Sequence, residues 1–310
     1  MDNVLTLIAD PARRNLSQIH VDKAARYLEQ SGATAVDPAR WLAEGIACDL
    51  PFNGVDPHVA EQDVRRQFNG APLDLAAQPV DGRRKKLLIA DMDSTIITIE
   101  TLDTLAALCG HADAVAEITE RAMNGELNFR ESLRTRLAML EGEDAARIDD
   151  VNRAVRYTSG APELIATLRA HGTYCALVSG GFTFTAHMVR DALGFDEARA
   201  NTMVIENGRL AGRATEPLLG REAKLTALQE LTGTLGITPD ATIAVGDGAN
   251  DLAMITAAGL GVAFRAKPIV SQQARFRVQH GDLTAILYLQ GYREDELVRP
   301  NARKPLPTAV

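Results

Sequence analysis

The run Asp91-Met92-Asp93-Ser94-Thr95 places two carboxylates two residues apart, directly after the apolar run Leu87-Leu88-Ile89-Ala90. On an extended segment that leaves a strand, both carboxylates can face the same crevice. A third carboxylate, Asp247, follows the apolar run from Ala241 to Val245. Carboxylates gathered without a cation raise each other's pKa unless a metal ion neutralises them, and hard oxygen ligands favour Mg²⁺. The pattern therefore predicts a magnesium site.

Three other interpretations of these aspartates can be tested against the residues that surround them. An isolated DxDST run is more simply explained as a turn with capping aspartates, and only its partner motifs weigh against that. An EF-hand loop beginning at Asp91 would need Gly and an acid where Ile96 and Leu102 stand. In Gly246-x-Gly248, the third glycine of a dinucleotide-binding loop is replaced by Asp251, which would repel a pyrophosphate.

Three short apolar runs are expected to position these groups as strands buried on both faces of a parallel sheet. They are Leu87–Ala90, Tyr174–Val178 and Ala241–Val245. Each ends in polar residues, and ligands of open parallel sheets bind outside the carboxyl ends of the strands. The fold class predicted is therefore α/β, with a Rossmann-like parallel sheet and one site at its carboxyl edge.

Helical patterns dominate residues 99–158, directly after the first of these strands. The predicted helices are Thr101–Leu108, Ala112–Met123, Phe129–Leu140 and Asp144–Arg156. We therefore expect a helical insertion of about 60 residues at this point of the sheet.

A small α+β domain is predicted for residues 1–80, followed by a boundary in the polar stretch 78–86. Its expected elements are a strand from Val4 to Ala9, a helix from the cap Ser17 to about Gln30 and, beyond them, an extended segment 41–50 and a helix 57–68. Within the first helix, Ile19, Ala24 and Leu28 share helical spacing. The main domain would span 81–298, and the proline-rich residues 299–310 are predicted to be a loose tail.

Composition limits the class of protein. The net charge of −8 argues against nucleic-acid and anionic-membrane binding, so an anionic substrate would need local cations. The three cysteines are dispersed and predict neither a disulfide framework nor a zinc site. The N-terminus Met1-Asp2-Asn3 lacks the features of a signal peptide, which makes a reduced, cytoplasmic setting the expectation.

A family resemblance rests on four motifs in order: Asp91 to Thr95, Ser179-Gly180-Gly181, Lys224, and Gly246 to Asp251. By these motifs the sequence is identified as a member of the haloacid dehalogenase (HAD-like) superfamily. Longer stretches are similar to the phosphoserine phosphatase family within it, namely 117–125, 132–136, 179–184 and 246–261. The resemblance covers about residues 86–285 and implies that the helices of 99–158 form a small cap.

The resemblance implies catalytic roles for Asp91 and Asp93. Asp91 would attack phosphorus and form an aspartyl-phosphate, while Asp93 would protonate the leaving oxygen and later take a proton from water. Mg²⁺ would be held by Asp91, the backbone carbonyl of Asp93, and Asp247, with Asp251 as a nearby supporting carboxylate.

The resemblance also implies that Ser179, the Gly180 N–H and Lys224 cradle the phosphate. A solvated helix lysine is the alternative for Lys224. Asn250 would contribute to the substrate site and Gly181 would line it.

Substrate choice is expected in the cap, where Glu100 would pair with the ammonium of phosphoserine and Arg136 with its carboxylate. Met123 and Phe129 would cover the pocket. Each of these residues has a simpler alternative. Glu100 could only complement a helix N-terminus, and Met123 and Phe129 could only pack the core. Arg136 could be a surface arginine, and spacing alone does not distinguish it from Arg130 and Arg134.

The leading hypothesis is a Mg²⁺-dependent phosphatase that hydrolyses O-phospho-L-serine in L-serine biosynthesis. A related phosphatase or phosphotransferase for another small phosphorylated metabolite is the alternative, and a non-catalytic ligand-binding module is the third. The Asp91/Asp93 pair argues against the third, because binding alone does not need Asp93. Residues 1–80 resemble regulatory amino-acid-binding modules, although a structural or dimerising appendage explains them equally well, so a homodimer stays open.

Overall fold

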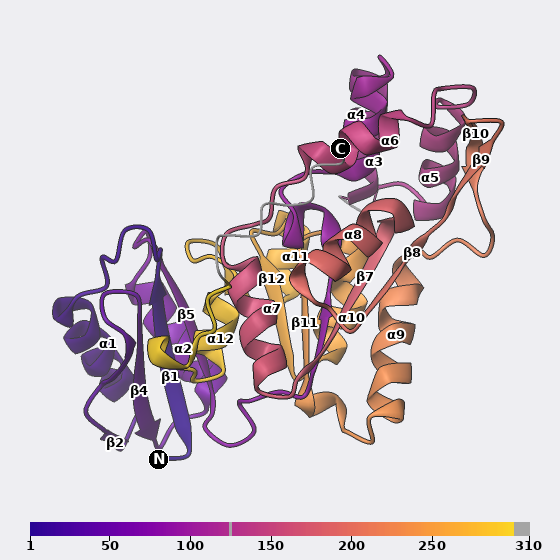
Figure 1. The fold of residues 1–310 in the computed structure, drawn as a ribbon. Helices are drawn as coiled ribbons and strands as arrows, with labels where there is room; N and C mark the ends of the chain where they lie inside the picture. The colour runs from indigo at the N-terminus through magenta and orange to yellow at the C-terminus, as the bar shows by residue number, and fades with distance from the viewer. Residues whose placement is uncertain (124–125, 301–310) are drawn as a thin grey trace.

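A computed structural model of the 310-residue chain describes residues 1–123 and 126–300, except for the side chain of Met123. The chain forms an antiparallel sheet near its N-terminus and a parallel sheet beyond it (Figure 1). A group of helices stands above the parallel sheet, at the top of the view. The described part of the chain contains no helix long and apolar enough to cross a membrane.

The parallel sheet has the strand order β13-β12-β11-β6-β7-β8, and every neighbouring pair is parallel. Its strands are β6 (Leu87–Ala90), β7 (Tyr174–Phe182), β8 (Glu197–Asn201), β11 (Thr242–Gly246), β12 (Leu260–Phe264) and β13 (Phe276–Val278). The predicted α/β fold is therefore confirmed, and β6 lies between the other two predicted strands.

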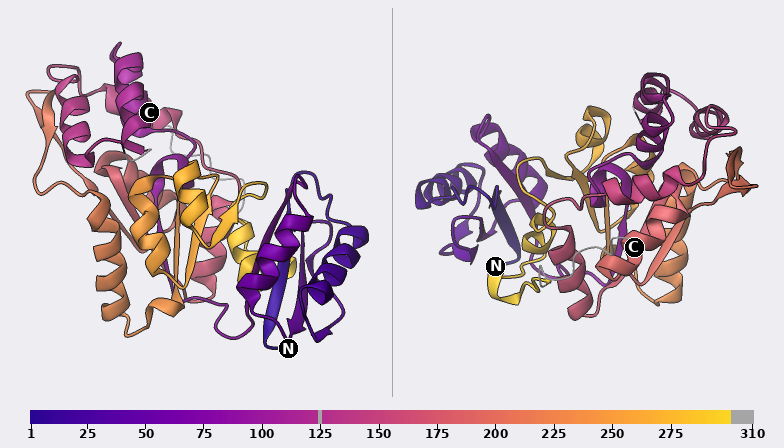
Figure 2. Two further views of the ribbon diagram at one scale, coloured as in Figure 1. Left: turned by 180° about the vertical axis from the view of Figure 1, so that it is seen from behind. Right: turned by 45° about the horizontal axis from the view of Figure 1, so that its top comes forward.

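Helices cover both faces of this sheet, which explains why all four residues of β6 are fully buried (Figure 2). Apolar side chains of alternate strand residues pack on one side against α7 (Ala161–Ala170), α8 (Thr183–Leu193) and α12 (Ala285–Leu289). On the other side they pack against α9 (Arg221–Thr234), α10 (Leu252–Ala257) and α11 (Pro268–Gln273). The continuous apolar runs in the sequence reflect this two-sided burial.

The helical insertion follows β6 through a tight turn at Met92–Ile96. Its helices are α3 (Thr101–Leu108), α4 (Ala112–Met123), α5 (Phe129–Ala138) and α6 (Arg147–Ala154). They enclose their own apolar cluster, which includes Leu105, Leu137 and Val151. We call these helices the cap.

A β-hairpin that the sequence did not predict completes the cap. It consists of β9 (Met203–Glu206) and β10 (Arg209–Ala214), and Met203 and Leu210 join the cap's apolar cluster. Both strands are short and mostly exposed or half-exposed. β9 has only three consecutive apolar residues, Met203 to Ile205, and those of β10 are interrupted by Gly212 and Arg213.

The N-terminal sheet has the order β2-β4-β1-β5, with β3 paired to β4. Its elements are β1 (Asn3–Ala9), α1 (Gln18–Gln30), β2 (Ala35–Val36), β3 (Arg40–Ala43), β4 (Ala47–Asn53), α2 (Pro57–Gln67) and β5 (Leu73–Pro79). The predicted extended segment 41–50 is two strands joined by a turn, and β5 was not predicted. Of the three residues at helical spacing in α1, Ala24 and Leu28 are buried together with Val21, whereas Ile19 is 74% exposed.

The second face of the N-terminal sheet packs against the parallel-sheet unit. Ile8 and Ala76 share one apolar cluster with Ile286 and Leu289 of α12, which lies between the two sheets (Figure 1). Arg83, in the predicted boundary segment, is buried and bonded to both units rather than solvated. The domain limits stay a prediction, but the junction is an extensive packed interface.

The predicted tail 299–310 lies mostly outside the described residues. Of the described part, Arg299 pairs with Glu294 at 3.0 Å, next to the turn Glu294–Glu296.

Candidate active site

Three neighbouring strands of the parallel sheet end at one place. β6 lies between β11 and β7 and leads into Asp91, while β7 carries Ser179 and β11 leads into Asp247. The backbone N–H of Asp91 continues the ladder by donating to the carbonyl of Val245 at 3.0 Å. The predicted convergence at the carboxyl edge of the sheet is therefore present.

The turn after β6 directs both of its carboxylates toward the site. Asp91 and Asp93 have extended backbone, and the chain then reverses at Ser94, whose φ of 57° lies in the left-handed region. The Asp93 carboxylate accepts hydrogen bonds from the backbone N–H (3.1 Å) and the hydroxyl (3.3 Å) of Thr101. Because Thr101 begins α3, this pair links the turn to the cap.

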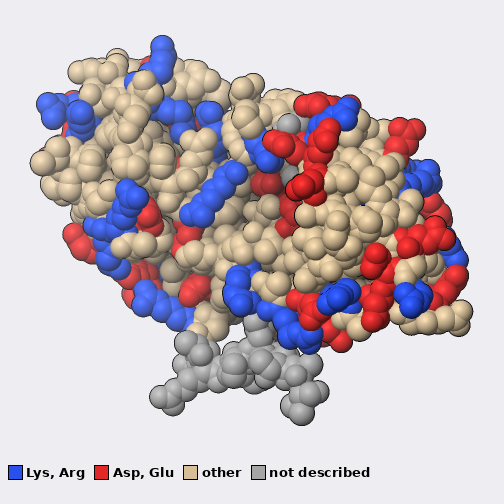
Figure 3. All heavy atoms as spheres, turned by 90° about the horizontal axis from the view of Figure 1, so that it is seen from above, with Lys and Arg blue, Asp and Glu red and all other residues tan. Residues whose placement is uncertain are grey.

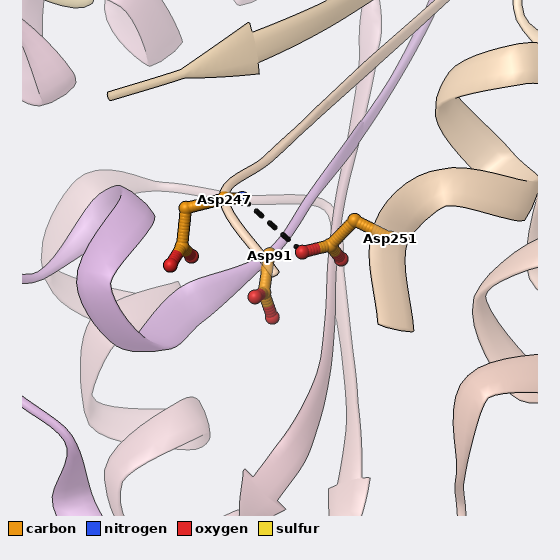
Figure 4. Close-up of side chains that lie close together, drawn as sticks. All are labelled: Asp91, Asp247 and Asp251. Atoms are coloured by element: carbon orange, nitrogen blue, oxygen red, sulfur yellow. Dashed lines mark hydrogen bonds between the residues drawn. The ribbon is translucent and has the colours of Figure 1, made fainter. Parts of the chain in front are cut away.

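Asp91, Asp247 and Asp251 form a buried acidic cluster (Figure 4). One carboxylate oxygen from each lies within 4.8 Å of the others. Burial raises the pKa of Asp91 well above its usual range, the charges of Asp251 and Asp247 add to this rise, and Lys224 opposes it. Burial and the charge of Asp251 also raise the pKa of Asp247 to about 7. Three buried carboxylates with such unfavourable ionisation fit the donor set of a divalent cation.

Asp251 differs from the other two carboxylates because both of its oxygens are already bonded. Oδ2 accepts from the backbone N–H groups of Asp247 (3.2 Å, Figure 4) and Gly248 (3.0 Å). Oδ1 accepts from Lys224 at 2.5 Å. A Cβ at Gly246 would lie 2.3 Å from Asp251 Cγ, so only glycine allows this approach. Asp251 therefore shapes the loop, whereas Asp91 and Asp247 each have one carboxylate oxygen that no hydrogen bond or ion pair occupies among the described residues.

Lys224 is a buried cation at the base of the site. Its side chain is 2% exposed, and Nζ lies 2.7 Å from Asp91 Oδ1. Burial lowers the pKa of Lys224, but the attraction of Asp251 and Asp91 outweighs this effect and raises it, so the ammonium stays charged. The alternative of a solvated helix lysine is wrong.

Thr95, a residue without a predicted role, ties the turn Met92–Ile96 to the acidic cluster. Its hydroxyl donates to Asp247 at 3.0 Å.

The end of β7 places small residues against Asp93 of the turn and Phe129 of the cap. Ser179 is 2% exposed, and its Oγ accepts from the N–H of Gly181 at 2.8 Å. A Cβ at Gly181 would lie 2.5 Å from Asp93 Oδ2, and a Cβ at Gly180 would lie 2.7 Å from the Phe129 ring. Both glycines therefore permit the close approach of the core and cap to this strand.

One cavity of about 300 Å³ joins the core motifs to the cap. Nine of the predicted site residues line it: Asp91, Asp93, Glu100, Phe129, Arg136, Ser179, Gly180, Gly181 and Asn250. Lys224, Asp247 and Asp251 do not line the cavity but contact or adjoin Asp91. The side chain of Met123 lies outside the described residues, so its predicted role stays a prediction.

The cap contributes a half-buried acid and a buried base to the cavity. Ser94 donates to Glu100 at 2.5 Å, and burial together with the charge of Asp93 raises the pKa of Glu100 to about 8. Arg136 is 6% exposed and lines the cavity, whereas Arg134 points to Glu216 with a side chain that is 60% exposed. Arg130 also lines the cavity, but its side chain is exposed. The geometry therefore favours Arg136 among the three arginines.

Several cavity residues had no sequence signal of their own. Thr101 and Thr119 line the cavity from cap helices, and Arg221 and Glu222 line it from the start of α9. Single threonines on amphipathic helices look like ordinary surface positions, so only their partners in space identify them. Glu222 lies two residues before the predicted site residue Lys224, and this proximity in the sequence was the one signal that could have indicated its place at the site.

Comparisons with known proteins agree with this geometry. The family model for haloacid dehalogenase-like hydrolases matches residues 88–256, and the chain belongs to that family. A phosphoserine phosphatase of Streptomyces coelicolor is 43% identical over 253 residues, covering 81% of this chain and 62% of the relative. A phosphoserine phosphatase of Saccharomyces cerevisiae is 33% identical, covering 95% of this chain and 97% of the relative.

A solved structure described as a phospho-aspartyl intermediate analogue of phosphoserine phosphatase matches with a TM-score of 0.64 at 38% identity. The match covers 66% of this chain and 98% of that one. The chain spans less than two thirds of the length of the Streptomyces relative, at 62%. The predicted family and fold are confirmed, and the family implies a divalent metal for which the buried acidic cluster is suited.

Proposed function

We propose that the protein is a Mg²⁺-dependent phosphatase that hydrolyses O-phospho-L-serine to L-serine and phosphate, the last step of L-serine synthesis. The observation that carries this proposal is one continuous cavity that joins Asp91 and Asp93 to the half-buried Glu100 and the buried Arg136. One end of the cavity has the groups for phosphoryl transfer. The other end has one acid and one base, as an amino-acid headgroup requires.

Asp91 is the proposed nucleophile. Its carboxylate oxygen forms a bond to phosphorus as the bond from phosphorus to the serine oxygen breaks, giving an aspartyl-phosphate. The Lys224 ammonium, 2.7 Å away, stabilises the ionised carboxylate and the negative charge of the transferring group. Water then attacks phosphorus, and the bond to Asp91 breaks to release phosphate.

Asp93 is the proposed acid and base. Burial and the charge of Asp91 raise the pKa of Asp93 to about 7, so that protonated and ionised forms are both accessible near neutrality. The protonated form gives its proton to the serine oxygen as that oxygen leaves. The carboxylate then takes a proton from the attacking water. The two hydrogen bonds from Thr101 keep the carboxylate in place for both transfers.

The proposed magnesium ligands are Asp91, Asp247 and the backbone carbonyl of Asp93. When bound, the ion supplies Lewis-acid neutralisation of the phosphate charge. Ser179 and the Gly180 N–H are proposed to hold the phosphate oxygens. This is supported by their place in the cavity lining at the end of β7, next to Gly181, which lies against Asp93. Asp251 keeps Lys224 and the loop after β11 in position.

Glu100 is proposed to bind the substrate ammonium and Arg136 the carboxylate, and Phe129 and Asn250 complete the pocket. On the molecular face seen from above, basic and acidic side chains are interspersed (Figure 3). This supports recognition of the anionic substrate by local cations such as Arg136 and Lys224, and not by the bulk charge of −8.

A substrate panel tests the proposal. Phosphate release is measured with phosphoserine, with phosphoethanolamine, which lacks the carboxylate, and with phospholactate, which lacks the ammonium. We expect the highest kcat/KM for phosphoserine and a loss of about tenfold or more for each analogue. Equal rates for all three would favour the alternative, a phosphatase for another small phosphorylated metabolite. Transfer of phosphate to an added alcohol in preference to water would indicate a phosphotransferase.

A structural role is proposed for residues 1–80, since one face of their sheet is covered by the parallel-sheet unit. The proposed division of the chain is an N-terminal appendage at 1–80 and a core at 81–298, into which a cap at about 99–158 is inserted. The packed junction supports a fixed appendage more than a freely moving one.

A further inference from the structure

The guanidinium of Arg136 is held by contacts within the cap. Its Nε donates to the carbonyl of Ser132 at 3.3 Å, and its Nη1 donates to the hydroxyl of Thr119 at 2.8 Å. Nη2 makes no hydrogen bond to the residues that the structure describes, and Arg136 lines the cavity. The free N–H groups therefore lie at the Nη1–Nη2 end of the fork, the end that can bind a carboxylate through two parallel bonds.

Thr119 connects this fork to a third cap helix. Its hydroxyl donates to Asp103 Oδ1 at 2.6 Å while accepting from Arg136. The direction of both bonds is fixed, because a guanidinium can only donate and a carboxylate only accepts. Thr119 is 5% exposed and the Asp103 side chain 22%, so little water competes with this chain of bonds. The chain joins α3, α4 and α5.

The hydroxyl also separates two opposite charges. Asp103 Oδ1 lies 3.8 Å from Arg136 Nη1, beyond hydrogen-bond distance, with the Thr119 oxygen bonded to both. Without that oxygen, Asp103 could move onto the guanidinium and occupy the donors that a substrate carboxylate needs. An internal carboxylate of this kind is a direct competitor of the ligand.

We infer that Thr119 and Asp103 are positioning residues that set the specificity of the site for substrates bearing a carboxylate. Thr119 orients the Arg136 fork toward the cavity and keeps Asp103 at 3.8 Å, too far for a direct hydrogen bond to the guanidinium. Asp103 fixes the direction of the Thr119 hydroxyl. This inference rests on the proposed function, because it requires that Arg136 binds the substrate carboxylate.

The test compares kcat/KM for phosphoserine with kcat/KM for phosphoethanolamine, whose ratio we call the carboxylate selectivity. Thr119→Val keeps the shape of the side chain but removes the hydroxyl. We expect the carboxylate selectivity to fall about tenfold or more, through a higher KM for phosphoserine, since a hydrogen bond to a charged group is lost. The kcat/KM for phosphoethanolamine is expected to stay within about threefold. Thr119→Ser, the matched control, is expected to keep the wild-type selectivity.

A second variant separates positioning from general damage to the cap. In the double variant Thr119→Val/Asp103→Asn, the competing charge is removed, and we expect part of the selectivity to return. A merely structural role for Thr119 does not produce this recovery. Should valine prevent folding, Thr119→Ala removes the same hydroxyl and is measured in its place.

The outcomes distinguish this inference from the proposed function. A wild-type enzyme without carboxylate selectivity would overturn both. A selective wild type whose Thr119→Val variant stays equally selective, or loses equal activity on both substrates, would overturn the positioning role alone.

Discussion

Replacing Arg83 by alanine should destabilise the whole protein, because this side chain joins the N-terminal sheet to the rest of the chain. Its guanidinium binds both oxygens of Asp49, at 2.6 and 3.2 Å, and the hydroxyl of Thr6. It also donates to the carbonyls of Tyr288 (3.2 Å) and Leu289 (3.1 Å). The Arg83 and Asp49 side chains are only 9% and 7% exposed, so the pair is shielded from water.

The magnitude follows from this burial. Removing one partner of a buried ion pair typically costs about 3–5 kcal/mol, because the remaining charge is left without compensation. In Arg83→Ala, Asp49 loses its charged partner and keeps only the hydrogen bond from the Thr6 hydroxyl. The carbonyls of Tyr288 and Leu289 each lose one donor and keep another, from Gly291 and Gln78. We therefore expect the free energy of unfolding to fall by about 3–5 kcal/mol, a large part of the roughly 5–15 kcal/mol typical of native proteins.

Urea unfolding measures this change with two probes. Fluorescence of Trp41, the single tryptophan, reports the N-terminal sheet, and far-UV circular dichroism reports all helices. In the wild type both transitions should coincide, since the two units share one apolar cluster. Arg13→Ala is the control: that side chain is 68% exposed and, among the described residues, forms an ion pair with Asp10 alone, so a change below about 1 kcal/mol is expected.

Two results would refute this reasoning. One is an Arg83→Ala protein that unfolds within about 1 kcal/mol of the wild type, as expected for a surface pair. The other is additivity in the double variant Arg83→Ala/Asp49→Ala, since removing both partners should cost less than the sum of the single changes.

Three further changes test the site. Lys224→Met should lower kcat by about 10²–10³-fold with the fold retained, as measured by phosphate release. The control Lys23→Met replaces an exposed lysine and should leave kcat unchanged. Glu100→Gln should stabilise the metal-free protein relative to the wild type, and by more as pH rises from about 5 to 8. The pKa of Glu100 in the folded protein, about 8, exceeds its usual value, so the folded wild type holds this proton more tightly than the unfolded chain does. The wild type therefore loses stability over that pH range, by up to about 1.4 kcal/mol per pH unit, and the glutamine variant does not. A gain that is independent of pH in urea unfolding with chelator would contradict this. Excess chelator should abolish turnover and Mg²⁺ should restore it; full activity in chelator would refute the metal site.

The parallel sheet and the cap were predictable because burial leaves a clear sequence pattern. Strands such as Leu87–Ala90 are continuously apolar only when both of their faces are covered, and the cap helices α3 and α4 begin and end at the predicted residues. The hairpin β9–β10 was not predictable in this way, since its strands are mostly exposed or half-exposed and its longest apolar run is the three residues Met203 to Ile205.

Charged residues with long-range partners were the harder part of the prediction. Arg83 stands in a run of basic residues that resembles a linker, and its partner Asp49 lies in an otherwise apolar strand. That isolated aspartate was the available signal, but nothing local identified its partner. Likewise, Thr119 and Asp103 belong to different helices, and only their arrangement around Arg136 gives them a role.

The identity of the nucleophile is tested most directly by trapping the phosphorylated enzyme. The protein is mixed with phosphoserine labelled with ³²P and quenched in acid, and the labelled peptide is sequenced. The account predicts label on Asp91 in the wild type, and neither label nor turnover above about 10⁻³ of wild type in a folded Asp91→Asn variant. Label on another residue, or turnover by Asp91→Asn comparable to the wild type, would contradict it.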